Sequence, residues 1–485
     1  MKERILVVGS GIFNTIMMVI SGIIVTRSYS KSLLGTYQQA VLLYSTLAIF
    51  ISLGTPKAVL YFVTPGSNRK KILWHILICL LVSSLIGNLA LYFSWDRICS
   101  LFSNPDLQYL WLLVSCNLFF RSFNEIFQVA AVSADKKKYI WRMDTTFGSL
   151  LLLSSFYICH YHLPISSLLV ANLFLELIKS SVLFYLIFHH YEGSWTGFDI
   201  DLFAKILKYS FPLLLSIFML LFARKIDSFL VSSFMVPEVY AVYSRGALEI
   251  PFGKILIYNI AILVMPVLVQ LYQKKECKEI VAIYHKEIQR SACLIVPLFF
   301  SFLLVHRDLI VFFYTEKYLE SVPVFLIYLF ILPIELYSFD TILQAMNKSI
   351  KVFYISCISA AIHLSISIVL IQFLGMIGPA IGALIAVVIT NALYLYNINH
   401  SLGFGIKEWL PWKFLAKVFS SCFACFILFY YIAPFVQIKL FWKVGLLFGF
   451  CYLFQIFWIW KLGIINQSDK SLITETYRKL PFLRK

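Results

Sequence analysis

Residues 72–93 read ILWHILICLLVSSLIGNLALYF and contain no Asp, Glu, Lys or Arg. As a helix, these 22 residues would extend about 33 Å, enough to cross a hydrocarbon core about 30 Å thick. Arg69, Lys70 and Lys71 come directly before the stretch. A basic flank followed by an uncharged apolar run predicts a membrane-spanning helix, and the same pattern recurs along the chain.

The composition of the whole chain agrees with this interpretation. Its 485 residues are 60% hydrophobic and only 13% charged. Soluble domains are roughly 45–50% apolar and about 25% charged. The composition therefore excludes a soluble enzyme, a disordered scaffold and a disulfide-stapled secreted domain.

Apolar runs of membrane-spanning length recur fourteen times. The predicted spans are residues 5–26, 38–63, 72–93, 109–131, 143–161, 168–188, 209–233, 241–270, 288–306, 321–346, 352–373, 377–400, 414–434 and 441–462. The sequence thus predicts an all-α polytopic membrane protein with about fourteen transmembrane helices.

The basic residues between these spans predict the orientation of the chain. If the N-terminus is cytoplasmic, 26 of the 41 Lys and Arg residues fall on the cytoplasmic side and six on the outer side. Short cytoplasmic loops carry an excess of Lys and Arg. We therefore expect both termini in the cytoplasm, and we attribute the net charge of +17 to topology, not to nucleic-acid binding.

The connections between the spans are short. The longest cytoplasmic ones, near 189–208 and 271–287, have about twenty residues, and the longest external ones lie near 94–108 and 307–320. A membrane enzyme of the polymerase or ligase type usually presents a large external catalytic loop. The sequence therefore predicts that the protein is not an enzyme.

A weak internal repeat relates the two halves of the chain. The first span ends near Arg27 and the next begins around Tyr37; the seventh ends near Phe234 and the eighth begins around Tyr243. Six spans separate the two copies, so they have the same orientation. This predicts parallel halves related by an axis along the membrane normal, as in some transporters.

Apart from Arg290 and Lys461, which lie at span ends and are counted with the cytoplasmic loops, nine cations fall inside the predicted spans. They are Lys57, Arg121, Lys179, Arg224, Lys225, Arg245, Lys254, Lys417 and Lys443. A charged side chain facing lipid costs about 3 kcal/mol on insertion scales, so these residues must face protein or water, or extend to the interface. Lys57, Lys417 and Lys443 are near span ends, and we expect them to snorkel.

Two interpretations of the other six remain open. In the first, each is a structural ion paired on its own helix, as the spacings Arg121/Glu125, Arg245/Glu249, Glu176/Lys179 and Arg224/Asp227 allow. In the second, which we prefer, they line a water-filled cavity for an anionic substrate. Phosphate or pyrophosphate fits such a cavity because Arg and Lys bind phosphate directly.

Other chemistry-bearing residues give no site. Cys422 and Cys425 form a C-x-x-C, but their Phe-rich surroundings predict a core role. His363 is expected to be a hydrogen-bonded core residue. No cofactor is predicted. Prolines in or at the ends of spans offer bends, at Pro212, Pro251, Pro266, Pro297, Pro333 and Pro379.

Three short motifs resemble those of a known family. The first is Thr26-Arg27-Ser28-Tyr29 followed by Leu34-Gly35-Thr36-Tyr37. The second is Lys208-Tyr209-Ser210-Phe211-Pro212, and the third is Asp227 followed by Glu238-Val239-Tyr240-Ala241-Val242-Tyr243. With the predicted topology, they make the chain similar to the Wzx-type lipid-linked oligosaccharide flippases of the multidrug/oligosaccharidyl-lipid/polysaccharide exporter superfamily.

The resemblance implies two six-helix lobes around a central cavity, followed by two further helices. The corresponding division is residues 1–200, 201–404, 405–465 and a basic cytoplasmic tail at 466–485. The implied function is translocation of undecaprenyl-pyrophosphate-linked oligosaccharide repeat units across the inner membrane by alternating access, for O-antigen, capsule or exopolysaccharide synthesis. The implied partners are the lipid-linked substrate, the bilayer and the polymerase and chain-length machinery.

By the same analogy, seven cations would line the cavity and hold the pyrophosphate: Arg27, Arg121, Lys179, Arg224, Lys225, Arg245 and Lys254. Glu125, Glu176, Asp227 and Glu249 are the candidate charge-pair or coupling carboxylates, with coupling to protons or sodium ions left open. Two alternatives remain, a cation-coupled multidrug exporter and a peptidoglycan lipid-precursor flippase. The first three spans contain no Asp or Glu, which argues against a cavity for cationic drugs.

Overall fold

The computed structural model describes residues 2–63, 68–133, 137–191, 193, 197–247, 264–405, 408, 410–436 and 438–463. Within these residues the chain is helical, with no β-strand. Ten of the described helices are long and apolar enough to cross a membrane. The prediction of an all-α, multi-pass membrane protein is confirmed.

The helices follow the predicted spans closely. Those of the first half are α1 (Lys2–Ser28), α2 (Lys31–Ile51), α3 (Thr55–Phe62), α4 (Arg69–Leu101), η1 (Pro105–Leu110), α5 (Trp111–Ser133), α6 (Lys137–His160), α7 (Ser166–His190), α8 (Ile200–Ala223), α9 (Ile226–Phe234) and α10 (Pro237–Gly246). The later helices are α12 (Cys277–Tyr314), η2 (Glu316–Ser321), α13 (Val322–Ile331), α14 (Phe339–Ala345), α15 (Ser349–Leu374), α16 (Ile377–Leu402), α18 (Trp412–Ile432), η3 (Ala433–Phe435) and α19 (Leu440–Lys461). Part of one predicted span, residues 248–263, lies outside the described residues.

Three predicted spans consist of two helices each. The break between α2 and α3 contains Leu53 and Gly54, both with positive φ, and a Cβ on Gly54 would lie 2.7 Å from the Ser210 carbonyl oxygen. The other breaks separate α8 from α9, and α13 from α14. Non-helical backbone at membrane depth is tolerated only where it is buried in protein or lines a water-filled cavity. These breaks are therefore places to look for function.

The predicted internal repeat is visible in how the helices begin. Two residues separate α1 from α2, and two residues separate α9 from α10. Tyr37 is the seventh residue of α2, and Tyr243 is the seventh residue of α10. The two tyrosines that are in register in the sequence thus occupy equivalent positions in their helices.

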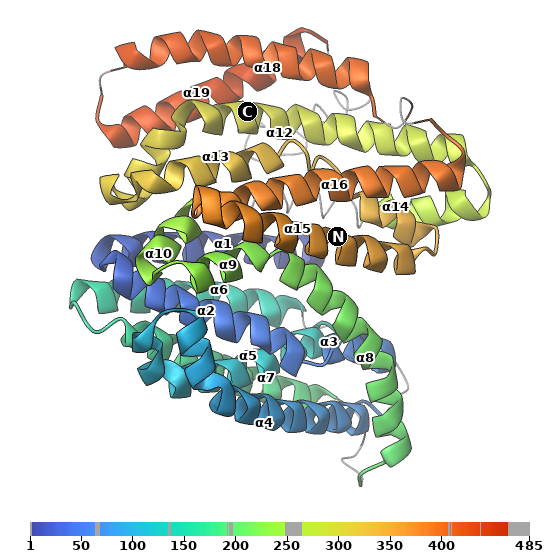
Figure 1. Ribbon diagram of the computed structural model, residues 1–485. Helices are drawn as coiled ribbons and strands as arrows, with labels where there is room; N and C mark the ends of the chain where they lie inside the picture. Colours follow the sequence, from blue (N-terminus) through green and yellow to red (C-terminus); the bar gives the residue numbers. More distant parts are fainter. Residues whose placement is uncertain are drawn as a thin grey trace, which may run out of the picture. The chain divides into compact units, whose positions relative to one another are not determined.

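The chain divides into two compact units, and each is described by itself. The first contains residues 1–244 and 363–379. In it, α1 packs on α6, α5 packs on α7 and α2, and α8 contacts α2, α3 and α4 (Figure 1). Leu73, Ile76 and Leu80 of α4 are at the centre of its core, each no more than 1% exposed.

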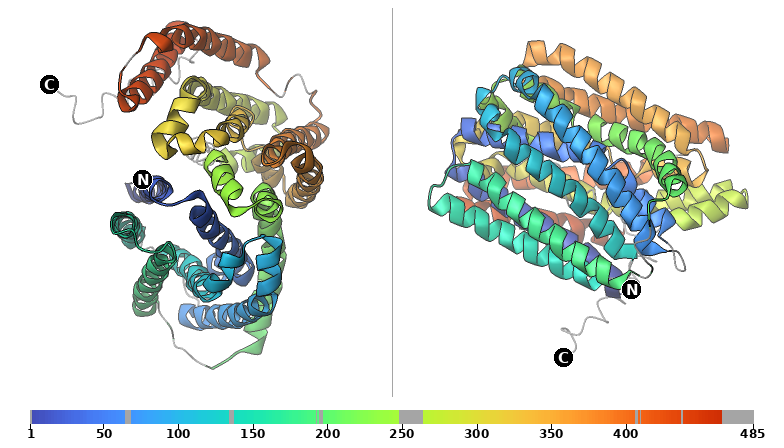
Figure 2. Two further views of the ribbon diagram at one scale, coloured as in Figure 1. Left: turned by 60° about the vertical axis from the view of Figure 1, so that its left-hand side comes forward. Right: turned by 90° about the horizontal axis from the view of Figure 1, so that it is seen from below.

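The second unit contains residues 245–362 and 380–485. In it, α18 and α19 form a helical hairpin that lies along α12 (Figure 1 and the left view of Figure 2). A separate core surrounds Tyr284, Ile288 and Leu343. The division at residues 200, 404 and 465 stays a prediction.

Candidate functional site

The densest group of charged residues in the first unit connects α5 and α7. Arg121 Nη1 lies 3.1 Å from Glu176 Oε1, and Arg121 Nε lies 3.9 Å from Glu125 Oε1. Asn124, one turn from Arg121, donates hydrogen bonds to the backbone carbonyl of Glu176 at 2.9 Å and to its carboxylate. The predicted Arg121/Glu125 pair therefore exists, but the shorter contact is between helices.

A second ion pair connects α7 to α6. Lys179 Nζ lies 3.2 Å from Asp144 Oδ1, and the two side chains are only 14% and 16% exposed. The predicted Glu176/Lys179 pair on one helix is wrong, because each residue turns to a neighbouring helix. Glu176 pairs with Arg121 of α5, and Lys179 pairs with Asp144 of α6, so both charges of α7 are neutralised by neighbouring helices.

The balance of charge in this α5–α6–α7 network is negative. Two cations, Arg121 and Lys179, face three carboxylates, which gives a formal net charge of −1. The Arg121 and Glu125 side chains are 47% and 37% exposed, so this end of the network is open. Arg121 and Lys179 are thus already occupied by carboxylates, and Glu125 has the longest of the three contacts.

The break between α8 and α9 carries two cations that, unlike Arg121 and Lys179, have no carboxylate partner among the described residues. Arg224 is the C-cap of α8 and Lys225 is the N-cap of α9; both side chains are exposed. Neither forms an ion pair with another described residue. The predicted Arg224/Asp227 pair is wrong: Asp227 is 1% exposed and accepts a hydrogen bond from the Tyr243 hydroxyl at 2.6 Å.

A buried histidine forms a hydrogen bond with the backbone at the same break. The last residue of α8, Ala223, has a backbone carbonyl that the break leaves without a helical partner. His363 Nδ1 lies 3.0 Å from that oxygen, and the His363 side chain is buried. The expectation of a hydrogen-bonded core histidine is confirmed.

The remaining predicted site residues are spread along the chain. Arg27 lies in the last turn of α1 and is exposed. The Arg245 guanidinium carbon lies 5.6 Å from the centre of the Tyr314 ring. Lys254 and Glu249 lie outside the described residues, so the Arg245/Glu249 pair stays a prediction.

Sequence reasoning missed the partners that lie on other helices. Asp144 and Asn124 were not among the predicted site residues, although both contact them. Lys443, for which no partner was predicted, pairs with Asp308 of α12 at 2.8 Å. Spacing along one helix shows only i,i+3 and i,i+4 partners, and the sequence carries no signal for pairs between helices.

The cysteines of α18 and α19 behave as core residues. Cys422, Cys425 and Cys451 are each at most 5% exposed, which confirms the interpretation of the C-x-x-C. In the part of the chain that the structure describes, no group of three or more His, Cys, Asp or Glu residues is placed to hold a metal ion.

Comparison with known proteins gives a family match and several similar structures. The family model described as polysaccharide biosynthesis protein matches residues 40–323. No curated protein sequence matches the chain. The lipid II flippase MurJ, in an inward closed conformation, is 16% identical with a TM-score of 0.72, over 93% of this chain and 98% of that one.

Two MATE transporters are similar at a lower TM-score. An inward-facing multidrug resistance MATE family transporter of the MOP superfamily is 15% identical with a TM-score of 0.64, over 81% of this chain and 96% of that one. The Vibrio cholerae MATE transporter VcmN in its bent form is 15% identical with a TM-score of 0.54, over 83% and 96%. At these identities the likeness shows the fold alone.

Proposed function

The chain belongs to the polysaccharide biosynthesis protein family, and from that premise we propose that it moves lipid-linked oligosaccharides across the membrane. The substrate is an undecaprenyl-pyrophosphate-linked repeat unit, carried from the cytoplasmic to the outer leaflet of the inner membrane by alternating access. The observation that carries the proposal is the family match over residues 40–323. The fold shared with a lipid II flippase supports it.

Within this proposal, the α8–α9 break is the best place for the pyrophosphate. Arg224 and Lys225 are exposed cations in a predicted membrane segment and have no ion-pair partner among the described residues. Cations at membrane depth are costly unless they face water or an anion. A pyrophosphate would supply that anion through charge-assisted hydrogen bonds. Arg27, Arg245 and Lys254 remain proposed cavity residues.

Arg121 and Lys179 take a different part in the same proposal. Because carboxylates already occupy both, we assign them to holding α5, α6 and α7 together around an acidic group. Glu125, with its single contact at 3.9 Å, is then the carboxylate best placed to bind a proton or a sodium ion for coupling. Glu176, Asp227 and Glu249 stay secondary candidates.

Two alternatives share the fold. One similar structure is a lipid II flippase and two are MATE transporters, so a peptidoglycan lipid-precursor flippase and a cation-coupled drug exporter both fit. The family match favours polysaccharide synthesis over both. The polymer made, whether O-antigen, capsule or exopolysaccharide, and association with a polymerase and chain-length machinery belong to the proposal only.

Deletion of the gene in its host tests the proposal. We expect loss of the surface polysaccharide, with lipid-linked repeat units accumulating in the cytoplasmic leaflet. Arg224→Ala combined with Lys225→Ala should show the same defect, whereas Lys57→Ala, which removes an exposed cation of α3, should not. Normal polysaccharide together with heightened drug sensitivity would contradict the proposal and favour the exporter.

A further inference from the structure

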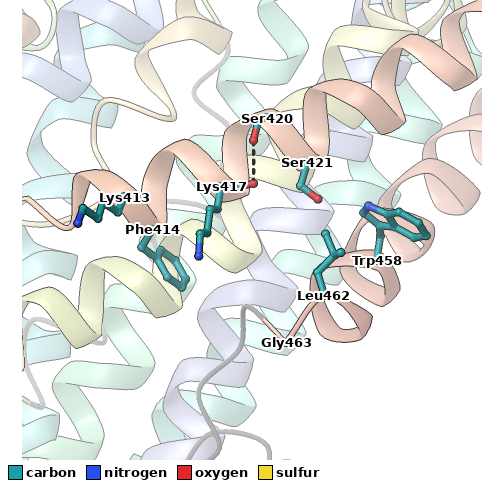
Figure 3. Close-up of a pocket in the computed structure, with 8 residues that line it drawn as sticks. All are labelled: Lys413, Phe414, Lys417, Ser420, Ser421, Trp458, Leu462 and Gly463. Carbon is teal, nitrogen blue, oxygen red and sulfur yellow. Dashed lines mark hydrogen bonds between the residues drawn. The ribbon is translucent and has the colours of Figure 1, made fainter.

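A pocket of about 680 Å³ lies between α18 and α19, the last two α-helices that the structure describes. Figure 3 shows Phe414 and Lys417 on the same side of α18, and Ser421 toward Leu462 and Trp458 of α19. Lys413 lies one turn before Lys417 and also lines the pocket. The volume is within the range of small-molecule sites, about 300–1,000 Å³.

Three polar groups of this α18–α19 pocket, on Lys413, Lys417 and Ser421, have no side-chain partner in the described part of the chain. Both lysines are exposed, and neither forms an ion pair with another residue that the structure describes. Ser421 Oγ is buried and has no hydrogen-bond partner among the described residues. Two free ammonium groups and an unsatisfied hydroxyl in one hollow are a donor set that fits phosphate oxygens.

The surroundings of the pocket match the interface of a bilayer. It lies at the start of α18 and the end of α19, which a hairpin brings to the same end. The topology predicted from the sequence places this end at the cytoplasmic face. Lys461 Nζ lies 5.8 Å from the centre of the Trp458 ring, so a third cation and an aromatic residue accompany the pocket. Trp and Lys are typical of this depth.

We propose that the α18–α19 pocket binds the phosphate of an acidic phospholipid head group in the cytoplasmic leaflet. The cytoplasmic leaflet carries acidic lipids, and basic pockets between transmembrane helices on that side bind their head groups. Phe414 and Leu462 supply apolar surface beside the charges, where the first carbons of the acyl chains would lie. This proposal does not depend on which substrate the protein transports.

Native mass spectrometry of the full-length protein in detergent tests the proposal. We expect the wild type to retain phosphatidylglycerol in preference to phosphatidylcholine. Lys413→Gln combined with Lys417→Gln should weaken that binding about 30-fold, a factor of about five for each lysine near a membrane surface. Lys274→Gln combined with Lys275→Gln removes the same charge from exposed lysines elsewhere and should leave binding unchanged.

A second variant separates binding from folding. Ser421→Ala keeps the charges and should weaken phosphatidylglycerol binding about fivefold, the worth of one hydrogen bond. Equal retention of phosphatidylglycerol and phosphatidylcholine by the wild type would overturn the proposal. So would a lysine variant that binds phosphatidylglycerol as tightly as the wild type does. Tighter binding of undecaprenyl phosphate than of phosphatidylglycerol, or displacement of the lipid by inorganic phosphate, would also overturn it and identify a different phosphate source.

Discussion

Gly35 shows how one residue of a short motif determines helix packing. A Cβ on Gly35 would lie 2.0 Å from the carbonyl oxygen of Pro237, the first residue of α10. Real Cβ atoms do not approach a backbone oxygen so closely. The glycine therefore allows the start of α10 to pack directly on α2, and this gives a physical reason for the Gly in Leu34-Gly35-Thr36-Tyr37.

Gly35→Ala should lower the stability of the protein by about 1–3 kcal/mol, since the new methyl group forces two helices apart. Thermal unfolding of the purified protein in detergent measures the effect. Gly445→Ala is the matched control, because an added Cβ at that position meets nothing within 4 Å. Equal melting temperatures for the two variants would show that α10 does not pack on α2 as described.

The ion pair between Lys179 and Asp144 is the clearest structural pair among the predicted cavity cations. Lys179→Asp or Asp144→Lys alone should destabilise the protein by more than about 1 kcal/mol, because like charges then meet in a half-buried position. The double exchange should restore most of the stability. Unfolding of all three variants measures this, and no recovery of stability in the double variant would contradict the ion pair between Lys179 and Asp144.

At the scale of elements, an ion pair and a hydrogen bond connect the start of α8 to the start of α4. Asp199 caps α8 by accepting a hydrogen bond from the Leu202 amide at 3.0 Å, and its other oxygen lies 2.7 Å from Lys71 Nζ. His75 Nδ1 is 2.7 Å from the Lys71 carbonyl oxygen, and the Asp199 amide donates to His75 Nε2 at 2.8 Å. One carboxylate thus caps α8 and connects it to α4, which positions the broken span formed by α8 and α9.

The hydrogen bond from Lys71, followed by that from the Leu202 amide, lowers the pKa of Asp199 from 3.8 to about 2. Because its pKa is lowered, the ionised Asp199 carboxylate stabilises the fold at pH values above 3.8, its ordinary pKa. This contribution is lost as the pH falls through about 2. Asp199→Asn keeps a good cap and removes the ion pair. The melting-temperature difference from wild type should therefore shrink between pH 5 and pH 2, and a constant difference would contradict the role of Lys71.

The breaks in the helices were the part of the fold that the sequence predicted least well. Prolines were expected to mark bends, and Pro333 does lie in the break between α13 and α14, but Pro212 and Pro297 lie inside continuous helices. The break at Gly54 is followed by Pro56, which was not among the prolines expected to mark bends, and the break at Lys225 has no proline. Neighbouring helices satisfy the groups that a proline frees. Hydropathy, in contrast, averages over a whole span, so it predicted where the helical segments lie and could not resolve where a span divides into two helices.

For the candidate site, the sequence could suggest which cations to consider, but not which carboxylates they pair with. Depth and charge selected Arg121, Lys179 and Arg224 as candidates, a choice that stays a prediction, and the partners of Arg121 and Lys179 could be read only from the structure. Glu176 and Asp144 lie on other helices than the cations they pair with, and tertiary packing decides such contacts. Only the structure distinguishes Arg224 and Lys225, which have no ion-pair partner among the described residues, from the paired cations Arg121 and Lys179.

At the scale of the whole molecule, the distribution of Lys and Arg predicts which loops face outward. Lys317 of η2 is on the predicted outer side, and Lys275 is on the cytoplasmic side. In intact cells, a membrane-impermeant thiol reagent should label Lys317→Cys and not Lys275→Cys. Labelling of Lys275→Cys alone would reverse the predicted orientation.

The most direct test of the account is transport by the purified protein. Reconstituted into vesicles, it should move a fluorescent undecaprenyl-pyrophosphate-linked oligosaccharide between leaflets, as measured by loss of accessibility to a membrane-impermeant quencher. Arg224→Ala with Lys225→Ala should reduce the rate at least tenfold, while Lys57→Ala should not change it. No movement of the lipid, together with ion-driven uptake of a cationic dye by the same vesicles, would contradict the account.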